Sequence, residues 1–206
     1  MSEKTIVILV LGILIFDFLL DLLLSFLNEK SSKKPIPEEL NGIYDDEKYQ
    51  KSQEYQNTTG RFGKISDTLS LIVMVGAIGL GWFGLLDDWA RSFSPLAPIT
   101  PLIFFGILFV ISDLMGIPFS LYQNFVIEAR FGFNKMTLKT YFADKLKGYL
   151  LTALLGGGLL VIFVLMVTLI GTDFWWYFWI VITIFLLALN MLYTSLLLPL
   201  FNKLVP

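Results

Sequence analysis

Four polar side chains interrupt the long apolar stretches of this sequence, and they are its first candidates for chemistry. Asp17 and Asp21 are spaced i,i+4, which places both carboxylates on one face of a helix. Asp113 lies near the middle of another apolar stretch, and Asn190 is the polar candidate of the last one. Because a charge inside the hydrocarbon layer is costly, the three aspartates are expected to face water or a protein interior.

A simpler interpretation of the carboxylates stays open. Asp21 is only six residues from the end of its apolar run, so Asp17 and Asp21 can both be solvated near the headgroups. Asp113 can make a structural hydrogen bond to a neighbouring helix instead of taking part in a function.

The elements that carry these residues are apolar runs long enough to cross a bilayer. The chain has 206 residues, of which 56% are hydrophobic, and its mean hydropathy is +0.73. A soluble domain is about 45–50% apolar. The fold class is therefore predicted to be an all-α, polytopic integral membrane protein with five transmembrane helices. Their expected ranges are residues 5–27, 65–86, 101–124, 148–170 and 174–198.

The expected domain organisation follows these runs. Residues 1–27 hold the first transmembrane helix, residues 28–64 form a cytoplasmic loop, and residues 65–206 form a four-helix membrane region. That region contains a second cytoplasmic loop at residues 125–147. In the second span, glycines at 76, 79, 81 and 84 are expected to allow close packing or local bending.

The basic residues predict the orientation. Thirteen of the fifteen Lys and Arg residues lie on one side of the predicted helices, and only Lys4 and Arg91 lie on the other. By the positive-inside rule, the N-terminus is expected outside and the C-terminus in the cytoplasm. The host membrane is expected to be a bacterial inner membrane or the endoplasmic reticulum membrane.

Composition also limits the chemistry. The sequence contains no cysteine and no histidine, which excludes disulfides, histidine metal ligands and catalytic pairs that need either residue. We assign no catalytic and no metal-binding residue to this chain, and expect no bound cofactor. The formal net charge of −2 indicates no particular partner; the lipid bilayer is the expected one, and nucleic acid is not.

The loop at residues 125–147 interleaves aromatic and basic side chains: Phe125, Phe131, Phe133, Tyr141 and Phe142 with Arg130, Lys135, Lys139, Lys145 and Lys147. Cytoplasmic loops of membrane proteins are commonly basic, with aromatics at the headgroups, and this alone can explain the composition. Two details go further. Gly132 and Asn134 tolerate positive φ and predict a turn, and Thr137 can cap the following helix. Either Phe131 or Phe133 is expected to anchor this turn.

On these residues the sequence resembles a known family. Three strings carry the resemblance: residues 49–55, YQKSQEY; residues 125–144, with Glu128, Gly132, Phe133, Asn134, Lys135, Thr137 and Asp144 as the motif residues; and residues 198–206, LPLFNKLVP. Together they resemble the N-terminal transmembrane region of the CAAX prenyl protease 1 family, which are integral-membrane zinc metalloproteases of the Ste24 type.

The resemblance implies a fold and a function. The family encloses a hydrated chamber within a seven-helix membrane barrel, of which this chain resembles part, and cleaves prenylated CAAX peptides or membrane-protein peptides. Its zinc site is an H-E-x-x-H helix, which a chain without histidine lacks. Whether this chain is enzymatic is therefore uncertain: it is expected to be a non-catalytic chamber wall, with zinc, the substrate and a missing C-terminal catalytic region belonging to the full-length parent.

One alternative from another functional class stays open. The chain can be a stand-alone membrane scaffold or small carrier in which Asp17, Asp21 and Asp113 line a path.

Overall fold

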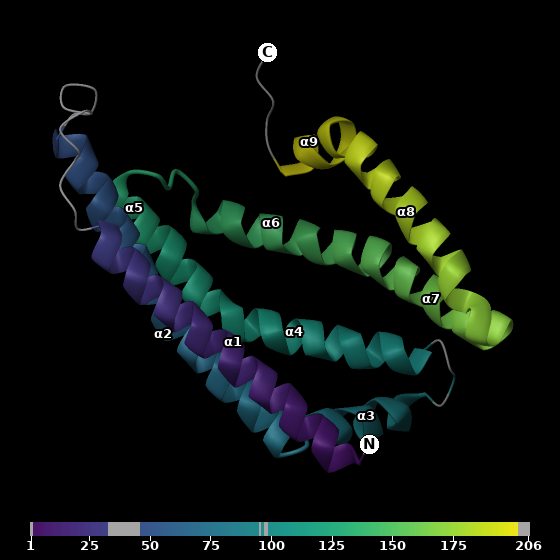
Figure 1. Cartoon of the computed structure of the whole chain (residues 1–206). Helices are drawn as coiled ribbons and strands as arrows, with labels where there is room; N and C mark the ends of the chain where they lie inside the picture. The colour runs from purple at the N-terminus through teal and green to yellow at the C-terminus, as the bar shows by residue number, and fades with distance from the viewer. Residues whose placement is uncertain (1, 33–45, 95, 97–98, 202–206) are drawn as a thin grey trace. The chain divides into compact units, whose positions relative to one another are not determined.

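The computed structural model describes residues 2–32, 46–94, 96 and 99–201, and these are nearly all helical (Figure 1). Residues 33–45 of the first expected loop and residues 202–206 of the third family string lie outside the described residues. In chain order the elements are α1 (Glu3–Ser32), α2 (Asp46–Gly79), α3 (Trp82–Phe93), α4 (Ile99–Tyr122), the π-helix η2 (Gln123–Glu128), α5 (Ala129–Phe131), α6 (Leu138–Leu151), the π-helix η3 (Thr152–Gly156), α7 (Gly157–Ile170), the 3-10 helix η4 (Gly171–Asp173), α8 (Phe174–Leu192), the π-helix η5 (Tyr193–Leu197) and α9 (Leu198–Phe201). The all-α prediction is confirmed.

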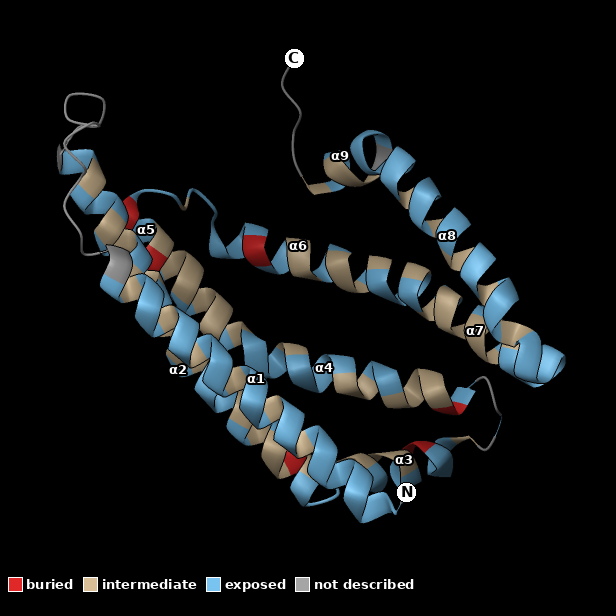
Figure 2. Cartoon of the chain, in the orientation of Figure 1, coloured by how far each residue is buried: buried red, intermediate tan, exposed pale blue. Residues whose placement is uncertain are grey.

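Four helical stretches of the described chain are long and apolar enough to cross a membrane: Glu3–Lys30, Glu47–Gly79, Ile99–Phe131 and Leu138–Ser195. The last has 58 residues, or about 87 Å of helix, which greatly exceeds the roughly 30 Å of a hydrocarbon layer. It contains the two final predicted spans, joined at η4. Large apolar side chains are exposed along these helices (Figure 2), as is expected of surfaces that contact lipid.

The predicted loop at residues 28–64 contains helix at both of its ends. Helix α1 continues to Ser32, and α2 joins the polar segment from Asp46 onward to the second apolar run without a break. Neither polar segment contains proline within its helix, so nothing ends the helix where the sequence becomes polar. Lys64 of α2 also pairs with Glu29 of α1 at 3.2 Å, beyond the apolar run of α1.

The second span ends earlier than predicted. Helix α2 stops at Gly79, and Gly81 has φ +71° before α3 begins at Trp82. Because only glycine adopts this region without a steric penalty, the local bending expected of these glycines is confirmed. The close packing is not. Within the described residues, and apart from the adjacent residues and the surrounding helix backbone, no heavy atom lies within 4 Å of a Cβ built at residue 76, 79, 81 or 84.

The loop predicted at residues 125–147 is also mostly helical. Its first part forms η2 and α5, and its last part lies in α6. Only the segment from Gly132 to Thr137 connects them. The polar character of this region therefore reflects exposed helix ends and not an extended loop.

The described residues form two compact units. The first consists of Met1–Leu86 and Val110–Lys135. Helices α1 and α2 lie side by side in it (Figure 1), and α2 also packs on the end of α4 and on η2, where the ring of Phe62 is 4.8 Å from that of Tyr122. Ala77, Ile127 and Phe131 are its buried apolar residues.

The second unit consists of Asp87–Phe109 and Met136–Pro206. Helices α7 and α8 form an antiparallel hairpin, in which Gly171 has φ +75° and the ring of Phe163 contacts those of Phe174 and Phe178. The sequence predicts a tight turn at residues 171–173, and this is confirmed by η4. The first half of α4 meets the α6–α7 helix, where the Phe109 and Tyr149 rings are 5.7 Å apart.

Candidate functional site

The structure brings together two of the three strings that carry the family resemblance. Tyr55 of α2 donates a hydrogen bond to Oε1 of Glu128 in η2, at 2.5 Å. Gln123 Nε2 donates to the same oxygen at 3.1 Å. Tyr55 and Glu128 are 73 positions apart in the chain, so their contact fixes the end of the third predicted span against the polar half of α2. We call this group of residues the α2–η2 junction.

Aromatic side chains complete the α2–η2 junction. The ring of Tyr55 contacts Phe131 at 5.2 Å and Phe133 at 4.9 Å between centroids, both nearly edge to face. Phe131 is only 5% exposed, whereas Phe133 is 62% exposed. The prediction that one of the two would anchor the turn is therefore confirmed, and the anchor is Phe131.

The turn that separates these rings is a Schellman motif. Gly132 has φ +83°, its N–H donates to the Ala129 carbonyl at 3.1 Å, and the Phe133 N–H donates to the Glu128 carbonyl at 2.9 Å. Both bonds satisfy carbonyl groups at the end of a helix, and the left-handed position favours glycine. The predicted turn is confirmed at Gly132. Asn134 does not share the positive φ; its backbone N–H donates to the Glu128 carbonyl at 3.2 Å.

An ion pair lies at the outer edge of the junction. Arg130 contacts Glu54 at 2.5 Å, and the two side chains are 63% and 55% exposed. At this exposure the pair contributes at most about 1 kcal/mol. The junction is therefore held mainly by Tyr55, Phe131 and Glu128.

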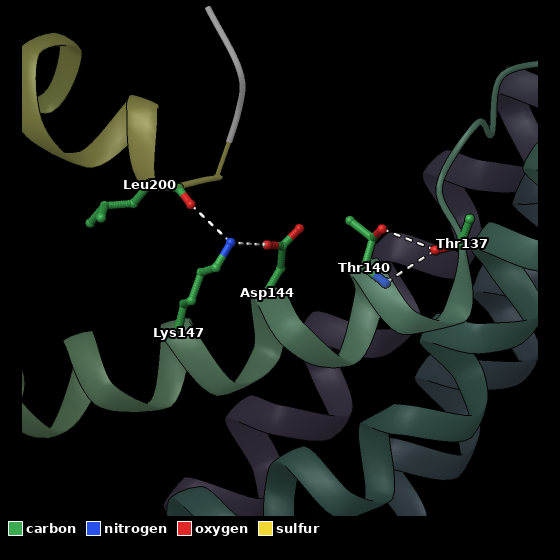
Figure 3. A network of polar contacts seen from close by, with 5 residues as sticks. All are labelled: Thr137, Thr140, Asp144, Lys147 and Leu200. Atoms are coloured by element: carbon green, nitrogen blue, oxygen red, sulfur yellow. Dashed lines mark hydrogen bonds and ion pairs between the residues drawn. The ribbon is translucent and has the colours of Figure 1, made fainter.

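Two other motif residues, Thr137 and Asp144, belong to the second unit, at the start and in the middle of α6 (Figure 3). The Thr137 hydroxyl accepts a hydrogen bond from the Thr140 N–H at 3.2 Å, which confirms its role as the N-cap. Lys147 Nζ donates to Asp144 and to the Leu200 carbonyl of α9, both at 2.9 Å. The start of the third family string is thus joined to α6. Lys135 is exposed at the end of the first unit.

The candidate intramembrane residues lie in different surroundings. Asp17 is exposed on α1, and Asp113 is half-buried on α4. Asp21 lines a small cavity of about 40 Å³ with Lys64 and Asp67. Asn190 is exposed on α8, which belongs to the other unit. The roles of these four residues stay predictions.

A larger hollow, of about 350 Å³, lies between α1 and α2, and the sequence analysis did not identify it. Among its lining residues are Asn28, Glu29, Gln56, Asn57, Arg61 and Lys64. The sequence contains a signal for this hollow, because Asn57, Arg61 and Lys64 are polar and lie on one face of a helix. We refer to this feature as the α1–α2 hollow. Within the described residues, no group of three metal-ligating side chains is close enough together to hold a metal ion.

Comparisons with known proteins agree with this arrangement. The family model described as "CAAX prenyl protease N-terminal, five membrane helices" matches residues 25–203. The CAAX prenyl protease 1 of Saccharomyces cerevisiae is 30% identical over 194 residues, which cover 86% of this chain and 42% of that protein. The Homo sapiens homologue is 34% identical and covers 83% of this chain and 38% of its own length.

A solved structure is similar over the whole chain. The crystal structure of S. mikatae Ste24p has a TM-score of 0.91 and 27% sequence identity, and it covers all of this chain but 49% of its own. The chain thus spans less than half the length of these relatives. The five-helix membrane fold and its resemblance to part of this larger membrane protein are confirmed.

Proposed function

We propose that this chain forms part of the chamber wall of a Ste24-like zinc metalloendopeptidase and is itself non-catalytic. The premise is that the chain belongs to the family of CAAX prenyl protease N-terminal membrane domains. The observation that carries this proposal is the match of the family model over residues 25–203, together with the structural similarity over the whole chain. The proposed substrates are prenylated CAAX peptides or membrane-protein peptides.

The residue types of the chain support a division of labour. An H-E-x-x-H site needs two histidines, and this sequence has none. In the proposed enzyme, zinc would be held by residues outside this chain, and zinc would activate the water that attacks the peptide bond. This chain would enclose the substrate and form part of the wall of the hydrated chamber.

The α2–η2 junction would make such a wall rigid. It joins the polar half of α2 to the end of the third span through one hydrogen bond to a carboxylate and one buried ring. Bonds of this type contribute about 1.5–3 kcal/mol each. A chamber that holds a peptide in one orientation requires helices that do not slide past each other, and the junction opposes such sliding.

A chimera tests the proposal. This chain would replace the matching N-terminal region of the S. cerevisiae CAAX prenyl protease 1, and the purified chimera would be given a farnesylated CAAX peptide. We expect zinc-dependent cleavage that is abolished by a chelator and restored by added zinc. The chain alone, as the control, should cleave nothing and retain no stoichiometric zinc.

Two results would contradict the proposal. One is a chimera that is monodisperse and helical but does not cleave the peptide, because a true wall domain should support catalysis. The other is zinc-dependent cleavage by the chain alone, which would show that the chain itself is catalytic.

A further inference from the structure

The α1–α2 hollow has the chemistry of an anion site. It lies within the first unit, between the two helices that pack along each other. Its lining carries two cations, Arg61 and Lys64, and one anion, Glu29. The Lys64–Glu29 pair, at 3.2 Å, neutralises both of its members. Within the described part of the chain, Arg61 makes no ion pair, and it lines the hollow.

Neutral donors surround this charge. Asn28 of α1 and Gln56 and Asn57 of α2 line the same space, and each amide provides two N–H donors. A guanidinium with several amide donors matches the oxygens of a phosphate group, which guanidinium can bind in a bidentate manner. A cation in the hollow would instead be opposed by Arg61, and the carboxylate that lines the hollow, Glu29, is already paired.

The position of the hollow along the helices indicates where the phosphate comes from. Asn28 follows the last residue of the first apolar run, and Lys64 precedes the first residue of the second. The hollow is therefore at the end of both apolar runs, where phospholipid headgroups lie. Its volume of about 350 Å³ is at the lower end of the range for small-ligand sites, which suits a headgroup but not a whole lipid.

Two acidic residues lie next to the hollow, on the side of the apolar runs. Asp21 and Asp67 line the adjoining 40 Å³ cavity, together with Lys64. Asp21 is about 10 Å deeper along α1 than Asn28, at 1.5 Å per residue. The two carboxylates repel an anion that moves inward, so they limit it to the level of Arg61.

We propose that the α1–α2 hollow binds the phosphate group of a membrane phospholipid, with Arg61 as the main ligand and Asn28, Gln56 and Asn57 as hydrogen-bond donors. The acyl chains would continue along the exposed apolar faces of α1 and α2. This inference does not rest on the proposed protease function, because it uses only the residues of the first unit.

The test compares lipid retention by two charge variants. The full chain would be purified in detergent after exposure to phosphatidylglycerol, and the retained phospholipid counted by native mass spectrometry. Arg61→Gln removes the main ligand. Lys30→Gln removes an exposed cation of α1 that does not line the hollow, so the two variants have the same net charge. Circular dichroism confirms that both remain helical.

We expect wild type and Lys30→Gln to retain phosphatidylglycerol equally and Arg61→Gln to bind it about tenfold more weakly, as is typical for the loss of a hydrogen bond to a charged group. Displacement of the lipid by millimolar inorganic phosphate would support the phosphate chemistry and assign free phosphate as an occupant. Equal loss in both variants would overturn the proposal, because it would indicate attraction to a diffuse basic surface. So would retention that Arg61→Gln leaves unchanged.

Discussion

Phe131 and Phe133 allow a controlled measurement of what holds the α2–η2 junction together. Both flank Gly132, and both contact the ring of Tyr55 at similar distances, 5.2 and 4.9 Å. They differ in burial, since Phe131 is 5% exposed and Phe133 is 62% exposed. Phe131→Ala and Phe133→Ala therefore remove the same ring contact but different amounts of buried surface.

The expected difference follows from the exposed fractions, which differ by 57 percentage points. Full burial of a phenylalanine side chain stabilises by about 1.5–3 kcal/mol, so the burial term differs by about 1–2 kcal/mol between the two sites. The aromatic pair adds about 0.5–1.5 kcal/mol at both sites and cancels. We expect Phe131→Ala to favour opening of the turn about tenfold more than Phe133→Ala does.

Hydrogen exchange provides a local measurement of this opening. The backbone N–H groups of Gly132, Phe133 and Asn134 donate within the turn, and mass spectrometry of a peptide covering residues 128–136 reports on them. We expect their exchange to be about tenfold faster in Phe131→Ala than in Phe133→Ala, because exchange follows the free energy of local opening. Equal exchange in the two variants, or faster exchange in Phe133→Ala, would refute the assignment of Phe131 as the anchor.

Four further predictions concern the turn at Gly132, two hydrogen bonds and the orientation of the chain. Gly132→Ala should destabilise the turn by about 1–2 kcal/mol, because alanine is strained at φ +83°, whereas Gly60→Ala in the middle of α2 should be neutral or stabilising by up to about 1 kcal/mol in thermal unfolding. Tyr55→Phe should cost about 1.5 kcal/mol through loss of the bond to Glu128, and Tyr49→Phe serves as its control; equal costs would contradict the pairing. Thr137→Ala should cost about 1 kcal/mol and speed exchange at the Thr140 N–H, and unchanged exchange would exclude the cap. Single cysteines at Ser92 and Thr140, in a chain that has no native cysteine, should be labelled from opposite sides, with Ser92 outside; labelling from one side contradicts the predicted orientation.

Local features were predictable from the sequence because their causes are local. Gly132 is needed for the left-handed residue of the turn, and Thr137 caps a helix that begins at the next residue. Phe131 and Phe133 lie on either side of Gly132, which predicted that one of the two rings would be an anchor, and Phe131 is the buried one. Each of these predictions depends on backbone conformation within a few residues, which sequence patterns represent well.

The contacts of Tyr55 could not be predicted in this way. The hydrogen bond from Tyr55 to Glu128 joins residues 73 positions apart, and neither neighbourhood contains a signal for the other. The family resemblance identified both strings separately, but it did not pair them. Long helices make such pairings hard to infer, because a shift of one helical turn of α2 against η2 would present Thr58 or Thr59 in place of Tyr55.

The helices at both ends of the predicted loop at residues 28–64 show a different limit of sequence patterns. Hydropathy shows where a helix leaves the hydrocarbon, but it does not show where the helix ends. Residues 28–32, after the first apolar run, and residues 46–64, before the second, are helical, and the contact between Glu29 and Lys64 joins them. The membrane boundary and the helix boundary therefore differ for both α1 and α2.

That difference also explains why Arg61 was counted only as a charge that sets orientation. A count of basic residues considers only the side of the membrane on which each one lies, and it ignores the residues around it. In the structure α2 is helical at residue 61, and Arg61 lines the α1–α2 hollow. The two roles are separable. Arg61→Gln leaves twelve basic residues on the predicted cytoplasmic side against two on the other, so the orientation should persist by the positive-inside rule. A variant that inserts in the same orientation but retains no phosphatidylglycerol would assign lipid binding to the position of this guanidinium and not to the overall charge of its side of the chain.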